Sequence, residues 1–515
     1  SLGLVDGIGT RNRYSASVLD QNNQHVVSEA MFGYTFVPFS PDVDACDYLI
    51  LIGGNPAMSK FAWLGGATDG WRRMLARQEQ GARIVVVDPR RTRSADDADL
   101  HLAIEPGTDW AVLLGLLTVI FREGREHNGA VACLPGDHVA RLRELIAEVD
   151  LEDLSARTGI PVATVEEIAR GYARARGAMC LTMTGVSQND TGTLGQWLST
   201  VLDIVTGHFD RAGGRHWDSG FVNMTDFASR SLAEDGVSRV RGQRTVMGCR
   251  SVCELPDEIH TPGEGQVRAL IIQAGNPVVA GPNGAALDQA FAELECLVAI
   301  DLVQRESHRH AHWLIPAPHW LERDELPFNL ANAQTDSFLQ YANRAVEPPP
   351  DVQPEWRFCT DVALAMGVPM LGRRGVNGAI RASRWLAKTL RRPGVELTPS
   401  LLERVSLAAT KRASYKAVKE APHGVAHGEK RYRQLAEFRK GAPILVAPEQ
   451  FCDLLRSQLR KRETPDDAFP FVMTGARKLH LMNSWLTELP NVQKREQENR
   501  CEIHPDDARA LGIAD

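Results

Sequence analysis

Residues 48–56 read Tyr48-Leu49-Ile50-Leu51-Ile52-Gly53-Gly54-Asn55-Pro56, and this stretch decides the fold class. An apolar run that ends in a glycine turn is typical of a parallel strand buried on both faces. A helical pattern over Trp71–Glu79 and a second apolar run, Ala82–Val87, follow it. Strand, helix and strand at this spacing predict a βαβ unit with a right-handed crossover.

The alternation of strands and helices continues beyond this unit. A short strand is expected at His101–Ile104, and Pro106-Gly107-Thr108-Asp109 follows it, where Thr108 or Asp109 can cap the next helix. The spacing of apolar residues then predicts a helix at Trp110–Phe121, helices between Val139 and Arg176 with a new start at Val162, a strand at Ala178–Met183 and a helix at Thr193–Thr206.

The same design recurs later in the chain. Val267–Ile272 is an apolar run that leads into Gly275-Asn276-Pro277, as the first strand leads into Gly54-Asn55-Pro56. Cys296–Asp301 is another buried run that ends in an acid, as the strand before Asp88 does. The sequence therefore predicts an α/β protein with two related α/β units and mainly parallel sheets.

The remainder of the chain has a different composition. Pro348-Pro349-Pro350 marks a boundary, and residues 371–440 are basic and helical in pattern. We interpret this segment as solvated helix faces or a linker, with a partner-binding surface as the alternative. Phe471-Val472-Met473-Thr474-Gly475 begins a new unit. The chain starts at Ser1 and stops within a pattern, so we expect the natural protein to be longer.

Composition narrows the classes of function. The 515 residues allow three or four domains of about 150 residues each. There are 58 Lys and Arg against 65 Asp and Glu, and the net charge of −7 argues against a nucleic-acid partner. The sequence contains no window of the ~20 apolar residues that span a membrane. Of nine scattered cysteines only Cys249 and Cys253 are close, which favours buried thiols in a reducing cytoplasm over a metal site.

Several predicted loops lie where α/β proteins bind ligands, at the carboxyl ends of strands and the N-termini of helices. They are Gly54-Asn55-Pro56, Asp88-Pro89-Arg90-Arg91-Thr92, Gly107-Thr108-Asp109, Gly185-Val186-Ser187-Gln188 and Gly275-Asn276-Pro277. Glycines let a backbone approach a pyrophosphate, arginines supply charge, and carboxylates bind purine or ribose. The chain has no Gly-x-Gly-x-x-Gly motif and no P-loop motif, which argues against a standard NAD-binding unit and a P-loop NTPase.

Taken in order, these motifs resemble the signature of the molybdopterin oxidoreductase family, which includes formate dehydrogenases, periplasmic nitrate reductases and dimethyl sulfoxide reductases. Later segments add to the resemblance: Leu314-Ile315-Pro316-Ala317, Thr474-Gly475-x-Arg477-x-x-His480-x-x-Asn483, and Ile503–Ile513, which is similar to the opening of the family's C-terminal β-barrel. The resemblance covers nearly the whole chain except about residues 371–440.

The resemblance implies four regions. Residues 16–215 would bind one pterin dinucleotide, and residues 1–15 together with 216–350 would form the α/β domain that binds the other. Residues 351–465 would be a helical linker or insertion. Residues 466–515 would be the start of a truncated C-terminal β-barrel domain.

The resemblance also implies the cofactor, bis-molybdopterin guanine dinucleotide with molybdenum or tungsten, and the residues that line it. One dinucleotide would be lined by Gly54, Asn55, Pro56, Asp88, Arg90, Thr92, Gly107 and Asp109, with the Gly185 loop beside them. The other would be lined by Gly275, Asn276, Pro277 and Asp301. From the barrel side, Thr474, Gly475, Arg477, His480 and Asn483 would approach.

Counting along the resemblance places Asp20 at the position of the family's metal ligand. A hard carboxylate suits high-valent molybdenum. The alternatives are an ordinary surface or capping Asp20, with Ser17 as a second ligand candidate. His25 would be a neighbouring active-site group unless it is structural. The histidine-rich stretch Glu306–His312 is interpreted as a polar loop, with a metal site as the alternative.

The implied function is that of a molybdenum or tungsten oxidoreductase acting on a small-molecule substrate, with an electron-transfer partner protein. A 4Fe–4S cluster is expected only in a segment that precedes this chain. Two alternatives stay open: a non-redox hydratase on the same cofactor, and a structural subunit that has lost the metal.

Overall fold

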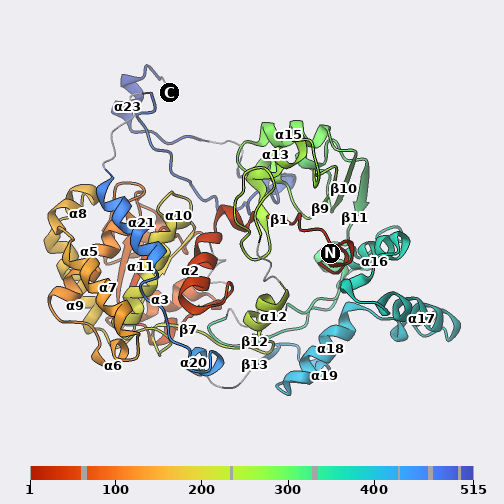
Figure 1. The fold of residues 1–515 in the computed structure, drawn as a ribbon, viewed down its shortest axis with the longest axis horizontal. Helices are drawn as coiled ribbons and strands as arrows, with labels where there is room; N and C mark the ends of the chain where they lie inside the picture. Colours follow the sequence, from red (N-terminus) through yellow and green to blue (C-terminus); the bar gives the residue numbers. More distant parts are fainter. Residues whose placement is uncertain are drawn as a thin grey trace. The chain divides into compact units, whose positions relative to one another are not determined.

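The structure is a computed structural model that describes residues 2–59, 67–231, 236–327, 334–426, 428, 430–461, 468–496 and 500–513 (Figure 1). The chain divides into two compact units, Ser1–Gly475 and Ala476–Asp515. The first unit contains both parallel sheets.

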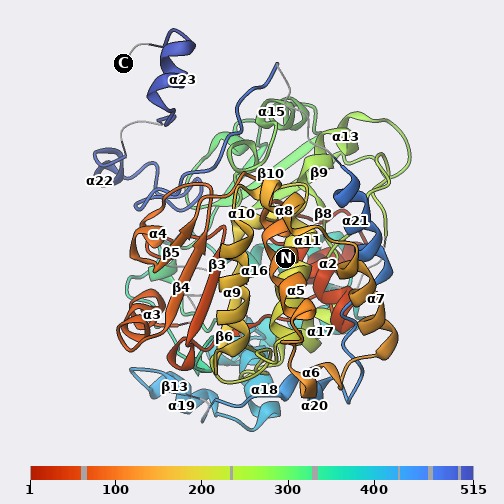
Figure 2. The same cartoon turned by 90° about the vertical axis from the view of Figure 1, so that its left-hand side faces the viewer.

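The first sheet has four parallel strands in the order β5-β4-β3-β6 (Figure 2). They are β3 (Tyr48–Ile52), β4 (Arg83–Val87), β5 (Leu100–Leu102) and β6 (Ala178–Thr182). Tyr48 is in register with Arg83 on one side and with Ala178 on the other. All five residues of β3 are buried, so the continuous apolar run reflects a strand covered on both faces, as predicted.

Alternate residues of β3 face two layers of helices. Ile50 and Ile52 belong to the main core, which they share with α5 (Asp109–Arg122), α9 (Val162–Arg174) and α11 (Gly192–Val205). Leu49 and Leu51 pack on the opposite side with residues of α3 (Gly70–Glu79) and α4 (Arg93–Asp97). The sheet therefore lies between two helical layers, as in a doubly wound domain.

The other predicted helices of this region are also confirmed. They are α7 (Gly136–Ala147), α8 (Leu151–Thr158), which ends at the left-handed Gly159, and α9, which begins at Val162 directly after Pro161. Shorter helices are α6 (Asn128–Val131), α10 (Thr184–Ser187) and α12 (Met224–Ser231).

The second sheet has three parallel strands in the order β11-β10-β9. They are β9 (Ala269–Gln273), β10 (Cys296–Asp301) and β11 (Trp313–Pro316). Helices α13 (Leu255–His260) and α15 (Gly284–Ala292) pack with this sheet around Leu287, Phe291 and Leu297. Most of β9 is exposed or half-buried, since it is an edge strand.

A short N-terminal segment joins the two sheets. After α1 (Leu2–Ile8), β1 (Tyr14–Ser15) pairs in parallel with β8 (Arg250–Ser251), and η1 (Ala16–Leu19) leads into α2 (Asn22–Phe32). Helix α2 packs against α11 of the first sheet's layer. Because the contacts divide the chain only at Gly475, the finer partition into residues 1–15 with 216–350 and residues 16–215 stays a prediction.

The basic segment is helical, as predicted, but it also contributes a strand. After α16 (Glu355–Met366) come α17 (Val376–Thr389), α18 (Pro399–Thr410), α19 (Tyr415–Glu420) and α20 (Gln434–Phe438). Between them β13 (Val425–Ala426) pairs with β12 (Phe338–Leu339). A strand of two residues is too short to leave a periodic signal, so sequence reasoning missed it.

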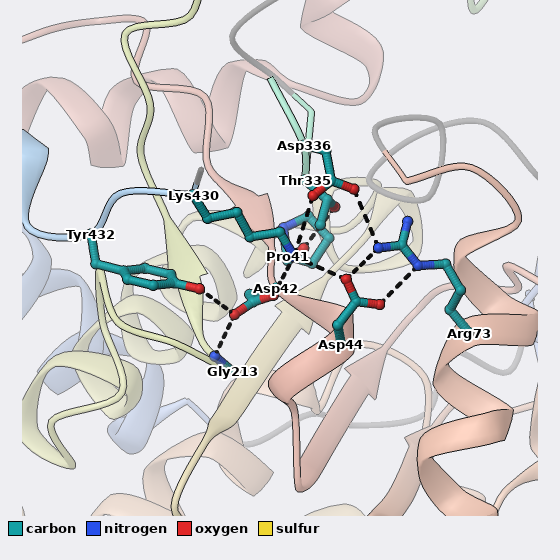
Figure 3. A network of polar contacts seen from close by, with 9 residues as sticks. All are labelled: Pro41, Asp42, Asp44, Arg73, Gly213, Thr335, Asp336, Lys430 and Tyr432. Carbon is teal, nitrogen blue, oxygen red and sulfur yellow. Dashed lines mark hydrogen bonds and ion pairs between the residues drawn. The ribbon is translucent and has the colours of Figure 1, made fainter. Parts of the chain in front are cut away.

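The end of this segment returns to the first sheet's layer. Helix α21 (Glu449–Arg460) contacts α11 and α7, and the Trp197 indole donates a hydrogen bond to the Val446 carbonyl at 2.8 Å. Figure 3 shows the polar contacts around Asp42 that involve residues shortly before α20 and α21. Lys430 and Tyr432 donate to the buried carboxylate of Asp42 at 2.8 and 2.7 Å. Burial alone would raise the pKa of Asp42, but these hydrogen bonds lower it.

The second unit, Ala476–Asp515, has α22 (Pro490–Gln493) and α23 (Pro505–Ala510). Within residues 468–496 and 500–513, pairing is limited to one bridge between Met482 and Trp485. The predicted start of a β-barrel is therefore not confirmed. A strand needs a neighbour to satisfy its backbone groups, and these residues provide no such ladder.

Candidate functional site

Four loops meet at the carboxyl edge of the first sheet because its strands are parallel. Backbone hydrogen bonds join the loops: the Gly53 amide donates to Val87 O, and the Gly185 amide donates to Gly53 O, both at 2.9 Å. The Asp88 amide donates to Leu102 O at 3.1 Å. The predicted Gly54-Asn55-Pro56, Asp88 and Gly185 loops therefore lie side by side.

A buried serine holds the Gly-Asn-Pro turn of this edge. The Asn55 Oδ1 atom accepts from the Ser94 hydroxyl at 2.9 Å and from the Ser94 amide at 3.3 Å. The Ser94 hydroxyl in turn accepts from the Ala57 amide at 3.0 Å. We call this arrangement the first Asn–Ser lock. It ties the loop after β3 to the first turn of α4, which follows β4.

Close backbone packing explains the glycines of the same turn. Gly53 has a left-handed φ of 63°, and a Cβ there would lie 2.8 Å from the Val186 amide nitrogen. A Cβ at Gly185 would lie 2.8 Å from the Gly53 Cα. Only glycine on both loops lets β3 and β6 approach this closely.

Two acids lie at this edge. Burial raises the pKa of Asp109 to about 6, and the charge of Asp88 adds to the increase. Burial also raises the pKa of Asp88, although the Arg90 amide donates to its Oδ1 atom at 2.9 Å. Burial destabilises the charged form of both carboxyls. Hydrogen bonds donated by a bound ligand would therefore stabilise each carboxylate.

The caps of the adjoining helices differ from one another. Thr92 caps α4 as its hydroxyl accepts from the Ala95 amide at 3.2 Å. Thr108 precedes α5, but its hydroxyl donates to the Glu105 carbonyl at 2.6 Å and makes no capping bond. Of the two predicted residues, Thr108 occupies the N-cap position of α5, but its side chain does not cap the helix because the hydroxyl is used within the turn.

The second sheet carries the same lock. The Asn276 Oδ1 atom accepts from the Ser307 hydroxyl at 2.8 Å and from its amide at 3.2 Å. The Ser307 hydroxyl accepts from the Val278 amide at 2.9 Å. Each bond of the first Asn–Ser lock thus has its counterpart, and we call this arrangement the second Asn–Ser lock. The predicted repeat of the Gly-Asn-Pro turn extends to its hydrogen bonds.

Histidines and charges surround the second lock. His308 is buried, and its Nε2 atom lies 3.1 Å from the Gly275 carbonyl and 3.8 Å from Asp301. The Arg305 guanidinium lies 3.5 Å from the Asp301 carboxylate. His310 pairs with Asp288 at 3.2 Å instead of joining His308. In the described ranges no group of three or more His, Cys, Asp or Glu is placed to bind a metal.

Asp20, the candidate metal ligand, follows the short helix η1. That helix comes directly after strand β1, which pairs with β8. Three residues later, the Asn23 side chain donates to the Ser187 carbonyl in the loop after β6, at 2.9 Å. The segment that carries the candidate metal ligand is thus connected to β8 and to the loop after β6.

His25 is buried in α2, and this burial lowers its pKa to about 4. The Nδ1 atom lies 3.1 Å from the Thr35 carbonyl, which can only accept, so Nδ1 carries the hydrogen. The imidazole is therefore neutral at neutral pH, with its Nε2 atom as the acceptor.

A family model for molybdopterin oxidoreductases matches residues 4–364, more than half of the chain and both locks. The chain belongs to the molybdopterin oxidoreductase family.

Similar proteins within the family differ in the reaction that their names give. They include the formate dehydrogenase subunit alpha of Methanocaldococcus jannaschii, 24% identical over 92% of this chain and 67% of that protein. Formate dehydrogenase H of Escherichia coli is 26% identical over 64% of this chain and 46% of that protein. The assimilatory nitrate reductase catalytic subunit of Bacillus subtilis is 26% identical over 56% and 42%. The chain spans between 42 and 67% of the length of these relatives.

A solved structure confirms the fold of this family member. Acetylene hydratase from Pelobacter acetylenicus matches 100% of this chain and 72% of that chain with a TM-score of 0.74 at 16% sequence identity. At this identity the likeness concerns the fold alone.

The predicted C-terminal motif falls in two parts. Gly475 lies in the first unit, where its carbonyl accepts from the Arg90 guanidinium at 3.2 Å. Thr474 precedes it and is exposed. Arg477, His480 and Asn483 lie in the second unit, where His480 pairs with Glu496 at 2.9 Å. Their approach to the cofactor loops stays a prediction.

Sequence reasoning missed the two serines of the locks. Ser94 and Ser307 are buried; Ser94 lies outside the quoted motifs, and Ser307 lies in the stretch Glu306–His312, where only the histidines drew attention. A signal was present: each serine follows its strand-ending acid, Asp88 or Asp301, at the same spacing of six residues. Comparing the two repeats position by position would have found both.

Helices that could cross a bilayer were sought in the described part of the chain, and no helix there has the length and apolar character for it.

Proposed function

We propose that this chain binds bis-molybdopterin guanine dinucleotide with molybdenum or tungsten and forms the catalytic part of an oxidoreductase. The pair of Asn–Ser locks carries the proposal, because it presents two equivalent Gly-Asn-Pro turns at the carboxyl ends of two parallel sheets. The proposed cofactor contains two similar dinucleotides, which two similar loops could bind. The carboxyl edge of the strands is where α/β sheets bind such ligands.

The residues of the first edge fit a dinucleotide. Gly107 has a φ of 82°, and a Cβ there would meet no atom within 4 Å, so this backbone is open to a ligand. The half-buried Asp88 and the buried Asp109 can accept hydrogen bonds from a guanine or ribose, and Arg90 and the N-terminus of α5 suit phosphate. Gly54, Asn55, Pro56, Thr92 and Gly185 would complete this half.

The second edge fits the other half. A Cβ at Gly275 would have its nearest neighbour at 3.5 Å, so this turn is also open. Asn276, Pro277 and Asp301 would line it. Arg477, His480 and Asn483, with Thr474 and Gly475, would add contacts from the C-terminal side.

Asp20 is the proposed metal ligand, and when bound the metal would supply two-electron chemistry, either oxygen-atom transfer or hydride acceptance. The chain's own contribution is to place the carboxylate directly before α2 and to keep His25 neutral. The Nε2 atom of His25 is then able to accept a hydrogen bond, while burial opposes its protonation. Electrons would pass to a partner protein through a 4Fe–4S cluster in a preceding segment.

The test uses the full-length protein. Asp20→Ala should abolish turnover and lower the bound molybdenum or tungsten while most of the pterin stays bound. Ser17→Ala is the matched control and should retain metal and activity. Wild-type turnover in Asp20→Ala, or loss of the metal in Ser17→Ala, would refute the ligand assignment.

Two measurements separate the alternatives. Metal that stays in one oxidation state throughout turnover would replace the oxidoreductase with a hydratase on the same cofactor. Elemental analysis that finds neither molybdenum nor tungsten in the full-length protein would leave a structural subunit. Metal that cycles with substrate supports the oxidoreductase.

A further inference from the structure

The basic segment carries a charge opposite to that of the rest of the chain. Residues 371–440 contain 17 Lys and Arg but only 5 Asp and Glu, whereas the whole chain has a net charge of −7. The segment also lies outside the family-model match, which ends at residue 364. Its surface is therefore not accounted for by the cofactor loops.

Helix α18 of this segment, labelled in Figure 1, carries apolar side chains that are exposed among the described residues. Leu407 is fully buried, but on the opposite side of the helix Leu401 is 40% exposed and Val405 is 58% exposed. Arg404 and Ala408 lie on the same exposed side, since residues three, four and seven apart share one face of a helix. Exposed apolar side chains mixed with arginine are typical of protein-binding surfaces.

A basic cavity of about 760 Å³ adjoins this face. Its lining includes Arg404 from α18, Lys411 from the turn, and Tyr415, Lys416 and Lys419 from α19. The cavity therefore combines four cations with an aromatic ring.

Ring contacts hold two of the cations in place. The Arg404 guanidinium lies 4.9 Å from the Tyr415 ring centre, and the Lys419 ammonium lies 4.9 Å from that of Tyr341. Lys416 is paired with Glu420 at 3.8 Å. Arg404 interacts electrostatically with Glu403, whereas among the described residues no ion pair is found for Lys411 or Lys419, so the cavity has positive charge left to neutralise.

We propose that the α18–α19 surface binds an acidic amphipathic segment of a partner protein. Carboxylates of that segment would enter the cavity, and its apolar side would cover Leu401, Val405 and Ala408. This mode places an amphipathic helix in a groove, with charge complementarity setting its direction. A protein segment is favoured as the occupant because it can present carboxylates to Lys411 and Lys419 and apolar side chains to Leu401 and Val405 at the same time.

The probe is a fluorescently labelled synthetic helix with Glu on one side and Leu on the other, measured by fluorescence polarisation. It should bind the full chain, and binding should weaken as salt is raised. Lys411→Glu with Lys419→Glu should raise Kd about tenfold or more, which corresponds to ~1.4 kcal/mol. The matched control, Arg72→Glu with Arg460→Glu, makes the same change in net charge at exposed residues of α3 and α21 and should change Kd less than about twofold.

The apolar side is tested separately. Leu401→Ala with Val405→Ala should weaken binding, whereas Leu454→Ala, at a leucine of α21 that is equally 40% exposed, should not. If the glutamate pair lowers the melting temperature, Lys411→Gln with Lys419→Gln takes its place.

Three results would overturn the proposal. One is equal weakening by both charge pairs, or equal binding of a scrambled peptide of the same composition, since either indicates non-specific attraction. Another is stronger binding to phosphatidylserine vesicles than to the peptide, which indicates a membrane surface. The third is no binding of the amphipathic peptide to the unmodified chain.

Discussion

The turn after β3 and the turn after β9 have the same hydrogen bonds in different surroundings. In both, an asparagine Oδ1 atom accepts from the hydroxyl and amide of a buried serine. The first turn, however, packs against the backbone of a fourth strand's loop, whereas β9 is the edge of its sheet. The hydrogen bonds of the lock therefore form both where another strand's loop packs against the turn and where the turn follows an edge strand.

The residue directly before each Gly-Asn-Pro turn shows the effect of having no further strand beside β9. Gly53 and Ala274 occupy equivalent places and both have a left-handed backbone, with φ of 63° and 51°. Gly185 and Val186 leave no space for a side chain at Gly53. Beside β9 no strand follows in the sheet, so alanine fits there despite its unfavourable φ.

The largest effect is expected for Gly53→Ala. The left-handed conformation costs about 1–2 kcal/mol with a side chain, and overpacking against the Gly185 loop costs about 1–3 kcal/mol more. Urea denaturation should show a loss of ~3 kcal/mol or more. Gly275→Ala is the control, because its Cβ has open space, and a similar loss there would break the comparison.

Asp109→Asn tests an acid at the first edge. In the cofactor-free chain, the raised pKa of about 6 means that the folded state prefers the protonated carboxyl. Stability is therefore fully present below pH 4 and is lost as pH rises from about 4 to about 6.

The asparagine variant should match the wild type near pH 4 and exceed it by about 3 kcal/mol at pH 7, at ~1.4 kcal/mol per pKa unit. Melting temperatures across this pH range measure the difference. A constant difference from pH 4 to 7 would contradict the buried ionisation.

Ser94→Ala and Ser307→Ala test whether the two locks are equivalent. Each removes a hydroxyl and leaves a buried backbone amide without an acceptor, which costs about 1–2 kcal/mol. The two losses should agree within about 0.5 kcal/mol, the usual limit for independent sites. Their cycles with Asn55→Ala and Asn276→Ala should show coupling within each lock and none between them.

The smallest effect is expected for Ala274→Gly. It relieves about 1–2 kcal/mol of backbone strain but adds about 0.5–1 kcal/mol of chain entropy on folding. A net gain of ~0.5 kcal/mol in urea denaturation is expected. If the variant is less stable instead, the methyl group of Ala274 contributes packing energy that exceeds the backbone strain.

Sequence reasoning succeeded where burial leaves a strong pattern. The strands Tyr48–Ile52 and Cys296–Asp301 are apolar runs because both are largely covered, and their positions were predicted closely. The repeat of the Gly-Asn-Pro turns was visible for the same reason. The family followed from the order of these motifs.

Other features depend on contacts that no local pattern encodes. Ser94 and Ser307 are single polar residues whose role requires the neighbouring turn. The pairing of Phe338–Leu339 with Val425–Ala426 joins two very short strands far apart in the chain. The roles of Asp20 and His25 rest on the resemblance, and their testing awaits the metal-bound protein.

The anchor around Asp42 has a consequence for how the protein can vary. Thr335, which precedes helices α16 to α19, donates to the Pro41 carbonyl, and Lys430, which follows them, donates to Asp42 (Figure 3). The chain on both sides of these helices is therefore held by two neighbouring residues, Pro41 and Asp42. These helices can be lengthened, exchanged or recharged during evolution while both Gly-Asn-Pro turns stay unaltered. A new partner can then be acquired without changing the chemistry that the loops support.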